Sequence, residues 1–103
     1  MKRLVFSSVF EADFAEITAY LHTEASPKVS RQWETAVVRL VGQLQKFPEL
    51  GRPRKDLHPP GIRTFLVNEF PNYLVFYRLV GNEIIFLRIR HGGMDLLALF
   101  PGD

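Results

Sequence analysis

Hydrophobic residues recur with a helical period in the first half of the chain. Between positions 8 and 23 they come every three or four residues, which is typical of the buried face of an amphipathic helix. They are Phe10, Phe14, Ile17 and Leu21. Ser8 and Glu11 predict a capping box at the helix start, because their side chains can accept hydrogen bonds from free backbone N–H groups. Asp13 and Glu16 come early enough to favour the helix dipole.

A second helical pattern follows the first after a short linker. Ser26 has the residue type of an N-cap, and Pro27 suits the first helical position, where a missing N–H costs no hydrogen bond. The apolar positions are Val29, Trp33, Ala36, Val37, Leu40, Leu44 and Phe47. Because Pro48 ends the pattern and the linker is short, we expect two antiparallel helices, with Trp33 in the core.

The second half of the chain has the composition of β-strands. Residues 73–79 and 84–90 are rich in aromatic and β-branched side chains, and Gly81-Asn82 between them suits the positive φ of a tight hairpin. Two further strands and a turn are predicted at residues 3–6, 62–67 and 68–71. Residues 49–61 contain several Pro and Gly residues, so we expect no regular element there.

Strict alternation along the last predicted strand puts Ile85, Leu87 and Ile89 on one side, and Ile84, Phe86, Arg88 and Arg90 on the other. In its neighbour, Leu74, Phe76 and Arg78 oppose Tyr73, Val75, Tyr77 and Leu79. Both faces of the sheet are therefore apolar over part of their length. The helices can cover only one face, so we expect residues 96–100 or a second protein to cover part of the other.

The predicted order is β-α-α-β-β-β, with a short apolar segment at the C-terminal end. Runs of helices followed by runs of strands favour an α+β fold, in which a helical hairpin packs on a largely antiparallel, twisted sheet. We expect one domain spanning residues 1–103.

Composition narrows the classes of function. With 47% apolar residues and a net charge of +2, the chain has a globular composition that permits a polyanionic partner without requiring one. It has no cysteine, and its three histidines lack metal-ligand spacing, so we expect neither a metal nor another cofactor. Since no apolar run is long enough to span a membrane and no signal peptide is evident, we expect a cytoplasmic protein.

Several segments, taken together in this order, resemble a known family. They are Gly51-Arg52-Pro53-Arg54 after a helix ending in Phe47-Pro48, then Gly61-Ile62-Arg63, Tyr73-Leu74-Val75-Phe76-Tyr77-Arg78, and Leu87-Arg88-Ile89-Arg90-His91-Gly92 followed by Asp95-Leu96. This set is similar to ParE proteins, the toxins of ParDE toxin–antitoxin modules within the ParE/RelE superfamily. The resemblance covers nearly the whole chain.

The resemblance implies a small bacterial toxin that inhibits DNA gyrase by binding and is held inactive by a ParD-like antitoxin. We expect the antitoxin to add as a helix or strand on the exposed apolar surface of the sheet or the helical hairpin. Neither a membrane nor a small-molecule substrate is expected. Two alternatives stay open. One is a RelE-like, ribosome-dependent endoribonuclease, and the other is a homologue with lost or retuned toxicity that still binds its antitoxin.

Two positions depart from the family pattern. ParE-type sequences usually carry an arginine just before the aspartate that follows the His-Gly pair, where this chain has Met94. They usually have an apolar residue before the histidine, where this chain has Arg90. We expect Arg90 to lie at the surface, on the face opposite Leu87 and Ile89, and to restore part of the missing positive charge.

The candidate target-binding residues are basic side chains on the predicted strands together with one histidine. They are Arg63, Arg78, Arg88, Arg90 and His91. In a ribonuclease, His91 would be the catalytic residue, beside cations that bind phosphate. The alternative is a purely structural role at the end of the strand. His91 would then form a hydrogen bond with the backbone, and the arginines would lie in solvent or pair with Glu83 or Asp95. Asp95 also suits the N-cap of a short helix.

A second basic cluster lies in the segment without a predicted element. Arg52, Arg54 and Lys55 could contact a phosphate backbone or the target, although such clusters are more often solvated loops. Tyr73 and Tyr77 could stack on bases, but alternation aligns them with Val75 and Leu79, which favours packing in the core.

Overall fold

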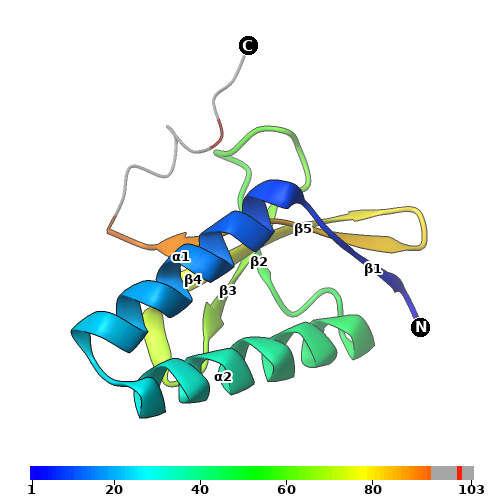
Figure 1. Cartoon of the computed structure of the whole chain (residues 1–103). Helices are drawn as coiled ribbons and strands as arrows, with labels where there is room; N and C mark the ends of the chain where they lie inside the picture. Colours follow the sequence, from blue (N-terminus) through cyan, green and yellow to red (C-terminus); the bar gives the residue numbers. More distant parts are fainter. Residues whose placement is uncertain (94–99, 101–103) are drawn as a thin grey trace.

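The computed structural model describes residues 1–93 and residue 100, and in these residues two helices pack on one face of a five-stranded sheet (Figure 1). The helices are α1 (Ser8–Glu24) and α2 (Pro27–Lys46). The strands are β1 (Arg3–Phe6), β2 (Arg52–Pro53), β3 (Arg63–Val67), β4 (Phe70–Val80) and β5 (Glu83–His91). The predicted α+β fold and element order are confirmed.

The strands lie in the order β1-β5-β4-β3-β2. Only β1 runs parallel to its neighbour, so the sheet is largely antiparallel, as predicted. The prediction for residues 49–61 was wrong at one place, because Arg52 and Pro53 pair with Thr64 and Arg63 as a two-residue edge strand. Gly81, with a φ of 57°, turns the hairpin between β4 and β5.

Serine residues start both helices. Ser26 caps α2 as predicted, since its Oγ accepts a hydrogen bond from the Val29 N–H at 3.0 Å. In α1 the cap is Ser7 rather than the predicted Ser8. The Oγ of Ser7 accepts from the Phe10 N–H at 3.0 Å and also donates to the Leu87 carbonyl oxygen at 2.9 Å. This second bond ties the helix start to β5, so a contact distant in sequence selects the cap.

The main core lies between the helices and the sheet. Trp33 is fully buried, as predicted, and its ring packs against Tyr73 with centroids 5.0 Å apart. Its indole Nε1–H donates to Thr18 Oγ1 at 3.2 Å, so the polar atom of this side chain is satisfied. Tyr77 is also fully buried in this core, which confirms a packing role.

A second cluster lies on the opposite face of the sheet. Leu57 and Ile62, from the segment between β2 and β3, pack there with Phe76, and the ring of Phe100 lies 4.9 Å from that of Phe76. Part of the predicted C-terminal cover is therefore present at Phe100, while residues 96–99 lie outside the described residues. The cover from Leu57 and Ile62 was not predicted.

One extra residue in β5 shifts its alternation. Phe76 pairs with Arg88 but Tyr77 pairs with Phe86, so Leu87 has no partner of its own in β4. Leu87 consequently packs in the second cluster, whereas Ile89 packs in the core under the helices. The prediction that Leu87 and Ile89 share one face was wrong, because strict alternation ignores this bulge.

Candidate functional site

The end of β5 is attached to α1 through a buried carboxylate. Asp13 is 3% exposed, and its oxygens accept hydrogen bonds from Arg88 Nε at 2.7 Å and Arg88 Nη2 at 3.0 Å. The backbone N–H of Ile89 donates to the same carboxylate at 3.2 Å. The hydrogen bonds from Arg88 to Asp13 raise the pKa of the Arg88 guanidinium. Asp13 therefore pairs with β5. The sequence predicted only that this carboxylate favours the helix dipole, and it did not predict this pairing.

Arg90 binds to the same helix. Its Nη1 lies 3.3 Å from Asp13 Oδ1 and 3.6 Å from Glu16 Oε1. The Arg90 side chain is 18% exposed, so the prediction of a surface side chain was wrong: the guanidinium packs along α1 between two carboxylates. The positive charge at this end of β5 is thus largely balanced within the protein. The predicted pairing of these arginines with Glu83 was also wrong, since Glu83 binds Arg3.

His91 is the exposed residue of this cluster. Its Nδ1 accepts a hydrogen bond from the Gly93 N–H at 3.0 Å, and its ring meets Tyr73 edge-to-face with centroids 5.3 Å apart. Burial raises the pKa of the Tyr73 hydroxyl. A shallow pocket of about 210 Å³ lies here, lined by Glu16, Ile17, Tyr20, Tyr73, Arg90 and His91.

Arg63 and Arg78 lie elsewhere in the structure. Arg63 Nη1 donates to the Gly51 carbonyl oxygen at 2.8 Å, and Arg78 Nε donates to the Pro60 carbonyl oxygen at 3.1 Å. Both arginines thereby hold the segment between α2 and β3 against the sheet. The structure brings together Arg88, Arg90 and His91, but it does not bring the other two predicted arginines to the same place.

The basic loop is partly neutralised by its own acidic residue. Arg54 donates to Asp56 through Nε at 2.9 Å and Nη2 at 2.7 Å. This pairing lowers the pKa of Asp56 and raises that of Arg54. Arg52 and Lys55 are exposed. Among residues 1–93 and 100, no group of three or more acidic or histidine side chains could hold a metal ion, and neither helix has the length and hydropathy to cross a membrane.

The similarity of this chain to known proteins identifies its family. The model of a family described as the ParE toxin of the type II toxin–antitoxin system parDE matches residues 4–96. The chain belongs to this family.

Two relatives show how far the similarity extends. Toxin ParE3 of Caulobacter vibrioides is 48% identical over 56 residues, which are 54% of this chain and 52% of that protein. The chain thus matches about half the length of that relative. A solved structure described as a chromosomal ParDE toxin–antitoxin system from P. aeruginosa has 25% sequence identity and a TM-score of 0.74, covering 88% of this chain and 96% of that one.

In this ParE-family chain, the pairing of Asp13 with Arg88 was not predicted from the sequence. Its signal was present in the sequence: Asp13 lies three residues after Phe10 and four before Ile17, and so on the buried stripe of α1. A carboxylate on such a stripe requires a cationic partner from the element that it faces. That partner is Arg88, although its strand could be identified only once the helix was placed against β5.

Proposed function

We propose that this ParE-family protein is a toxin that binds DNA gyrase and inhibits it without cleaving RNA, and that a ParD-like antitoxin neutralises it in the cytoplasm. The family match supports the toxin assignment. The hydrogen bond that the His91 imidazole accepts at the end of β5 supports a binding mechanism over a catalytic one. Met94 and Asp95, which bear on the same segment, lie outside the described residues.

His91 is poorly arranged for general base catalysis, and this observation carries the proposal. In a neutral imidazole one nitrogen holds the proton and the other accepts hydrogen bonds. Nδ1 accepts a hydrogen bond from the Gly93 N–H, which favours the tautomer with the hydrogen on Nε2, and that tautomer offers no free lone pair to a 2′-hydroxyl. The neighbouring Tyr73 is no better as a base, because its raised pKa keeps the hydroxyl protonated.

The arginines argue in the same direction. A ribonuclease needs cations placed where negative charge develops on the phosphate. Arg88 is held in a two-pronged pair with Asp13, and Arg90 contacts both Asp13 and Glu16. Turning either guanidinium towards a phosphate would leave the buried Asp13 carboxylate with fewer partners, which costs free energy.

One observation favours the alternative of a RelE-like endoribonuclease. Tyr73, Arg90 and His91 line a single shallow pocket, so an aromatic ring, a cation and an imidazole do meet at one place. The two functions can be distinguished by whether DNA synthesis or protein synthesis stops first in cells that express the protein.

Pulse-labelling after induced expression distinguishes the two functions. If the protein inhibits gyrase, DNA synthesis should fall before protein synthesis, and co-expression of the neighbouring reading frame should restore growth. If translation stops first, the protein is an endoribonuclease. Growth without arrest, despite a folded protein that still binds the neighbouring gene product, would indicate the homologue with lost toxicity.

Two surfaces are candidates for the target contact. We propose that the end of β5, with Arg88, Arg90 and His91, is the primary one, and that Arg52 and Lys55 form the second. His91→Ala should weaken growth arrest without changing the thermal melt, because His91 is exposed. Full toxicity in His91→Ala, together with loss in the double variant Arg52→Ala/Lys55→Ala, would move the target contact to the loop.

A further inference from the structure

The strand β1 forms an open edge of the sheet. It pairs with β5 on one side, and in Figure 1 it lies between the start of α1 and the end of α2. On its other side no described strand lies beside it. An open edge strand presents backbone N–H and C=O groups to any chain that can pair with them.

Alternate residues of β1 turn their backbone groups away from β5. The N–H groups of Arg3 and Ser7 donate to carbonyl oxygens of the β4–β5 hairpin at 2.8 Å and 3.0 Å, so the odd-numbered residues face β5. The backbone groups of Leu4 and Phe6 consequently point to the open side. Among the described residues, no strand pairs with them there.

Two features limit pairing at this edge to Leu4 and Phe6. At the start of the strand, Gln45 Nε2 donates to the outward carbonyl oxygen of Lys2 at 2.8 Å, so α2 already occupies that position. At the other end, Ser8 begins α1 and is no longer extended. The open stretch therefore offers the outward groups of two residues.

These limits select one two-fold register for a second copy of this chain. Pairing Leu4 with itself across the axis would place Phe6 against the occupied Lys2, and pairing Phe6 with itself would place Leu4 against the helical Ser8. Pairing Leu4 with Phe6 of the second copy uses both open residues of both chains, and each such antiparallel pair exchanges two backbone hydrogen bonds. The two-fold axis then passes through Val5.

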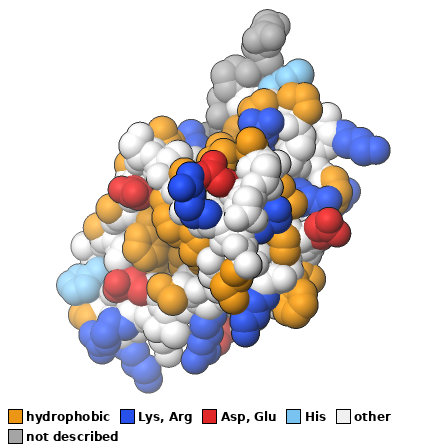
Figure 2. Space-filling model, turned by 90° about the vertical axis from the view of Figure 1, so that its right-hand side faces the viewer, with side chains coloured by type: hydrophobic (Ala, Val, Ile, Leu, Met, Phe, Trp, Pro, Cys, Tyr) orange, Lys and Arg blue, Asp and Glu red, His pale blue; other side chains and the backbone are white. Residues whose placement is uncertain are grey.

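The side chains at this edge suit the same register. Phe6 is 38% exposed although its ring stacks on Phe86 with centroids 5.0 Å apart, and Val9 in the first turn of α1 is 45% exposed. The space-filling view from the side on which β1 lies shows hydrophobic side chains gathered among basic and acidic ones (Figure 2). In the selected register Leu4 and Phe6 form aliphatic–aromatic pairs across the two strands, a favourable combination.

The charges beside β1 are self-complementary. Lys2 lies at the start of the strand, where its ammonium donates to the Gly81 carbonyl oxygen at 2.9 Å. Glu11 is exposed in the first turn of α1, just after the end of the strand. The register sets Lys2 opposite Ser8 of the second copy, and Ser8 and Glu11 share one face of α1. Antiparallel pairing therefore brings the basic end of each copy to the acidic end of the other, which favours a second copy as the partner.

We propose that this chain forms a two-fold symmetric dimer through β1, in which the two sheets join into one and Leu4 of each copy pairs with Phe6 of the other. The paired stretch is short, so the dimer is weak, with a Kd on the order of 10 μM. β1 pairs with residues 83–86 of β5, so the contact between the copies lies beside the half of β5 that precedes Arg88, Arg90 and His91. The inference does not depend on the identity of the target or of the antitoxin.

A mixed dimer of isotope-labelled and unlabelled protein tests the register directly. In an antiparallel ladder the non-hydrogen-bonded pairs approach most closely, with Cα atoms about 4.5 Å apart. Val5 forms such a pair with Val5 of the second copy, so isotope-filtered NMR should show a contact between their Hα atoms. A protein that is dimeric by sedimentation but lacks this contact would overturn the pairing through β1.

A lysine on the edge tests the surface without assuming the register, because natural edge strands use lysine to prevent pairing. Phe6→Lys should weaken the dimer at least about tenfold in sedimentation equilibrium. Leu66→Lys is the matched control, since Leu66 is a half-exposed residue of β3 on the far side of the sheet. Loss of the dimer in Leu66→Lys alone would overturn the inference, as would a wild-type protein that stays monomeric at high micromolar concentrations.

Exchange of charges is a second test that leaves the core unchanged. Lys2→Glu and Glu11→Lys should each weaken the dimer about threefold or more, because each brings like charges together across the axis. Both substitutions in one chain should restore most of the affinity, since opposite charges then face each other again. Thermal melts check that each variant is folded. A double variant that dimerises no better than the single variants would contradict the antiparallel register.

Discussion

Asp13 is the residue on which the geometry of the candidate site depends most. Its carboxylate is buried, and it accepts hydrogen bonds from Arg88, from Arg90 and from the backbone of Ile89. A buried charge is stable only when it is paired and hydrogen-bonded, and these contacts provide both conditions. The same contacts fix the direction of the two arginine side chains along α1.

Replacing Asp13 with asparagine should destabilise the protein strongly. Asp13→Asn removes the negative charge while two largely buried guanidinium groups remain, so we expect the free energy of unfolding to fall by about 2–4 kcal/mol. Urea unfolding measures this change. Glu16→Gln is the control, since the Glu16 side chain is 70% exposed and the change should be below about 0.5 kcal/mol. Equal effects of the two variants would show that the Asp13 cluster is not a buried ion pair.

Tyr77 has a comparable role on the other side of the core. Its hydroxyl accepts a hydrogen bond from the Gly51 N–H at 2.8 Å and donates one to the Pro48 carbonyl oxygen at 2.7 Å. Tyr77→Phe leaves both backbone groups without this partner, so we expect a loss of about 1–3 kcal/mol in urea unfolding. Tyr20→Phe should change little, because Tyr20 is exposed. A neutral Tyr77→Phe would mean that solvent replaces both bonds.

The same hydroxyl predicts how stability depends on pH. Burial raises the pKa of Tyr77 above the ordinary tyrosine value of about 10. A group whose pKa is higher in the folded state stabilises the fold while it is protonated in both states, and this contribution is lost as the pH rises through the folded pKa. We therefore expect the free energy of unfolding to fall above about pH 10. Tyr77→Phe should remove part of that fall, and an unchanged alkaline slope in this variant would contradict the assignment.

At the scale of elements, two glycines in neighbouring segments should respond in opposite ways. A Cβ at Gly51 would overlap the ring of Tyr77, whereas a Cβ at Gly42 in α2 meets nothing within 4 Å. Gly51→Ala should therefore destabilise the protein by about 1–3 kcal/mol through overpacking. Gly42→Ala should stabilise it by about 0.5–1 kcal/mol through helix propensity. Thermal melts of the two variants check both signs, and a stabilising Gly51→Ala would contradict the packing around Tyr77.

The elements that the sequence predicted are those defined by local pattern. Both helices follow from their apolar spacing, and the β4–β5 hairpin follows from residue type and from Gly81. The strand β2 was missed because Arg52 and Pro53 become a strand only by pairing with β3. The bulge at Leu87 was missed because apolar residues occupy both faces of β5, so alternation carries no signal of the shift.

The candidate site was predictable in part for the same reason. Arg88, Arg90 and His91 are close in sequence and remain close in the structure. Arg63 and Arg78 were grouped with them by charge alone, but each is used to hold a carbonyl oxygen of a nearby segment. The role of Asp13 depends on how α1 lies against β5, and that arrangement is a property of the packed molecule rather than of any local pattern.

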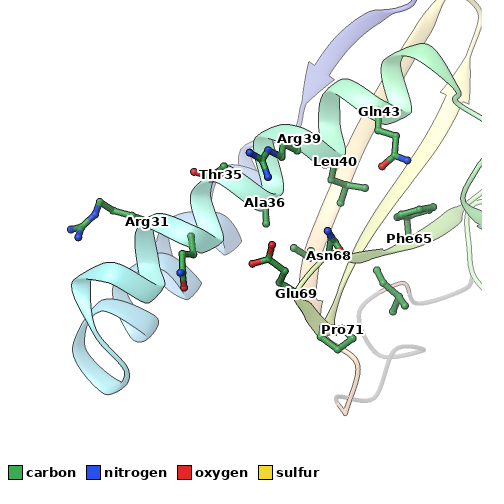
Figure 3. A pocket seen from close by; sticks show the side chains of 13 residues that line it. Arg31, Thr35, Ala36, Arg39, Leu40, Gln43, Phe65, Asn68, Glu69 and Pro71 are labelled. Carbon is green, nitrogen blue, oxygen red and sulfur yellow. The ribbon is translucent and has the colours of Figure 1, made fainter.

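At the scale of the whole molecule, the fold presents two separate surfaces that could be tested for a partner. The end of β5, with Arg90 and His91, lies beside α1, whereas an open groove of about 990 Å³, lined by Arg31 and Arg39 among others, lies between α2 and β3 (Figure 3). The proposed function assigns the target to the first surface. Arg39→Glu, in the groove, should therefore leave toxicity intact, which growth assays after induced expression can measure; loss of growth arrest would show that the target also contacts the groove.

The measurement that tests the central claim most directly is a pair of assays on the purified protein. One follows supercoiling and cleaved complexes of DNA gyrase, and the other follows ribosome-dependent cleavage of a translated mRNA. We expect inhibited supercoiling or accumulated cleaved complexes, with the mRNA intact. Ribosome-dependent cuts that disappear in His91→Ala, with no effect on gyrase, would contradict this account and identify the protein as an endoribonuclease.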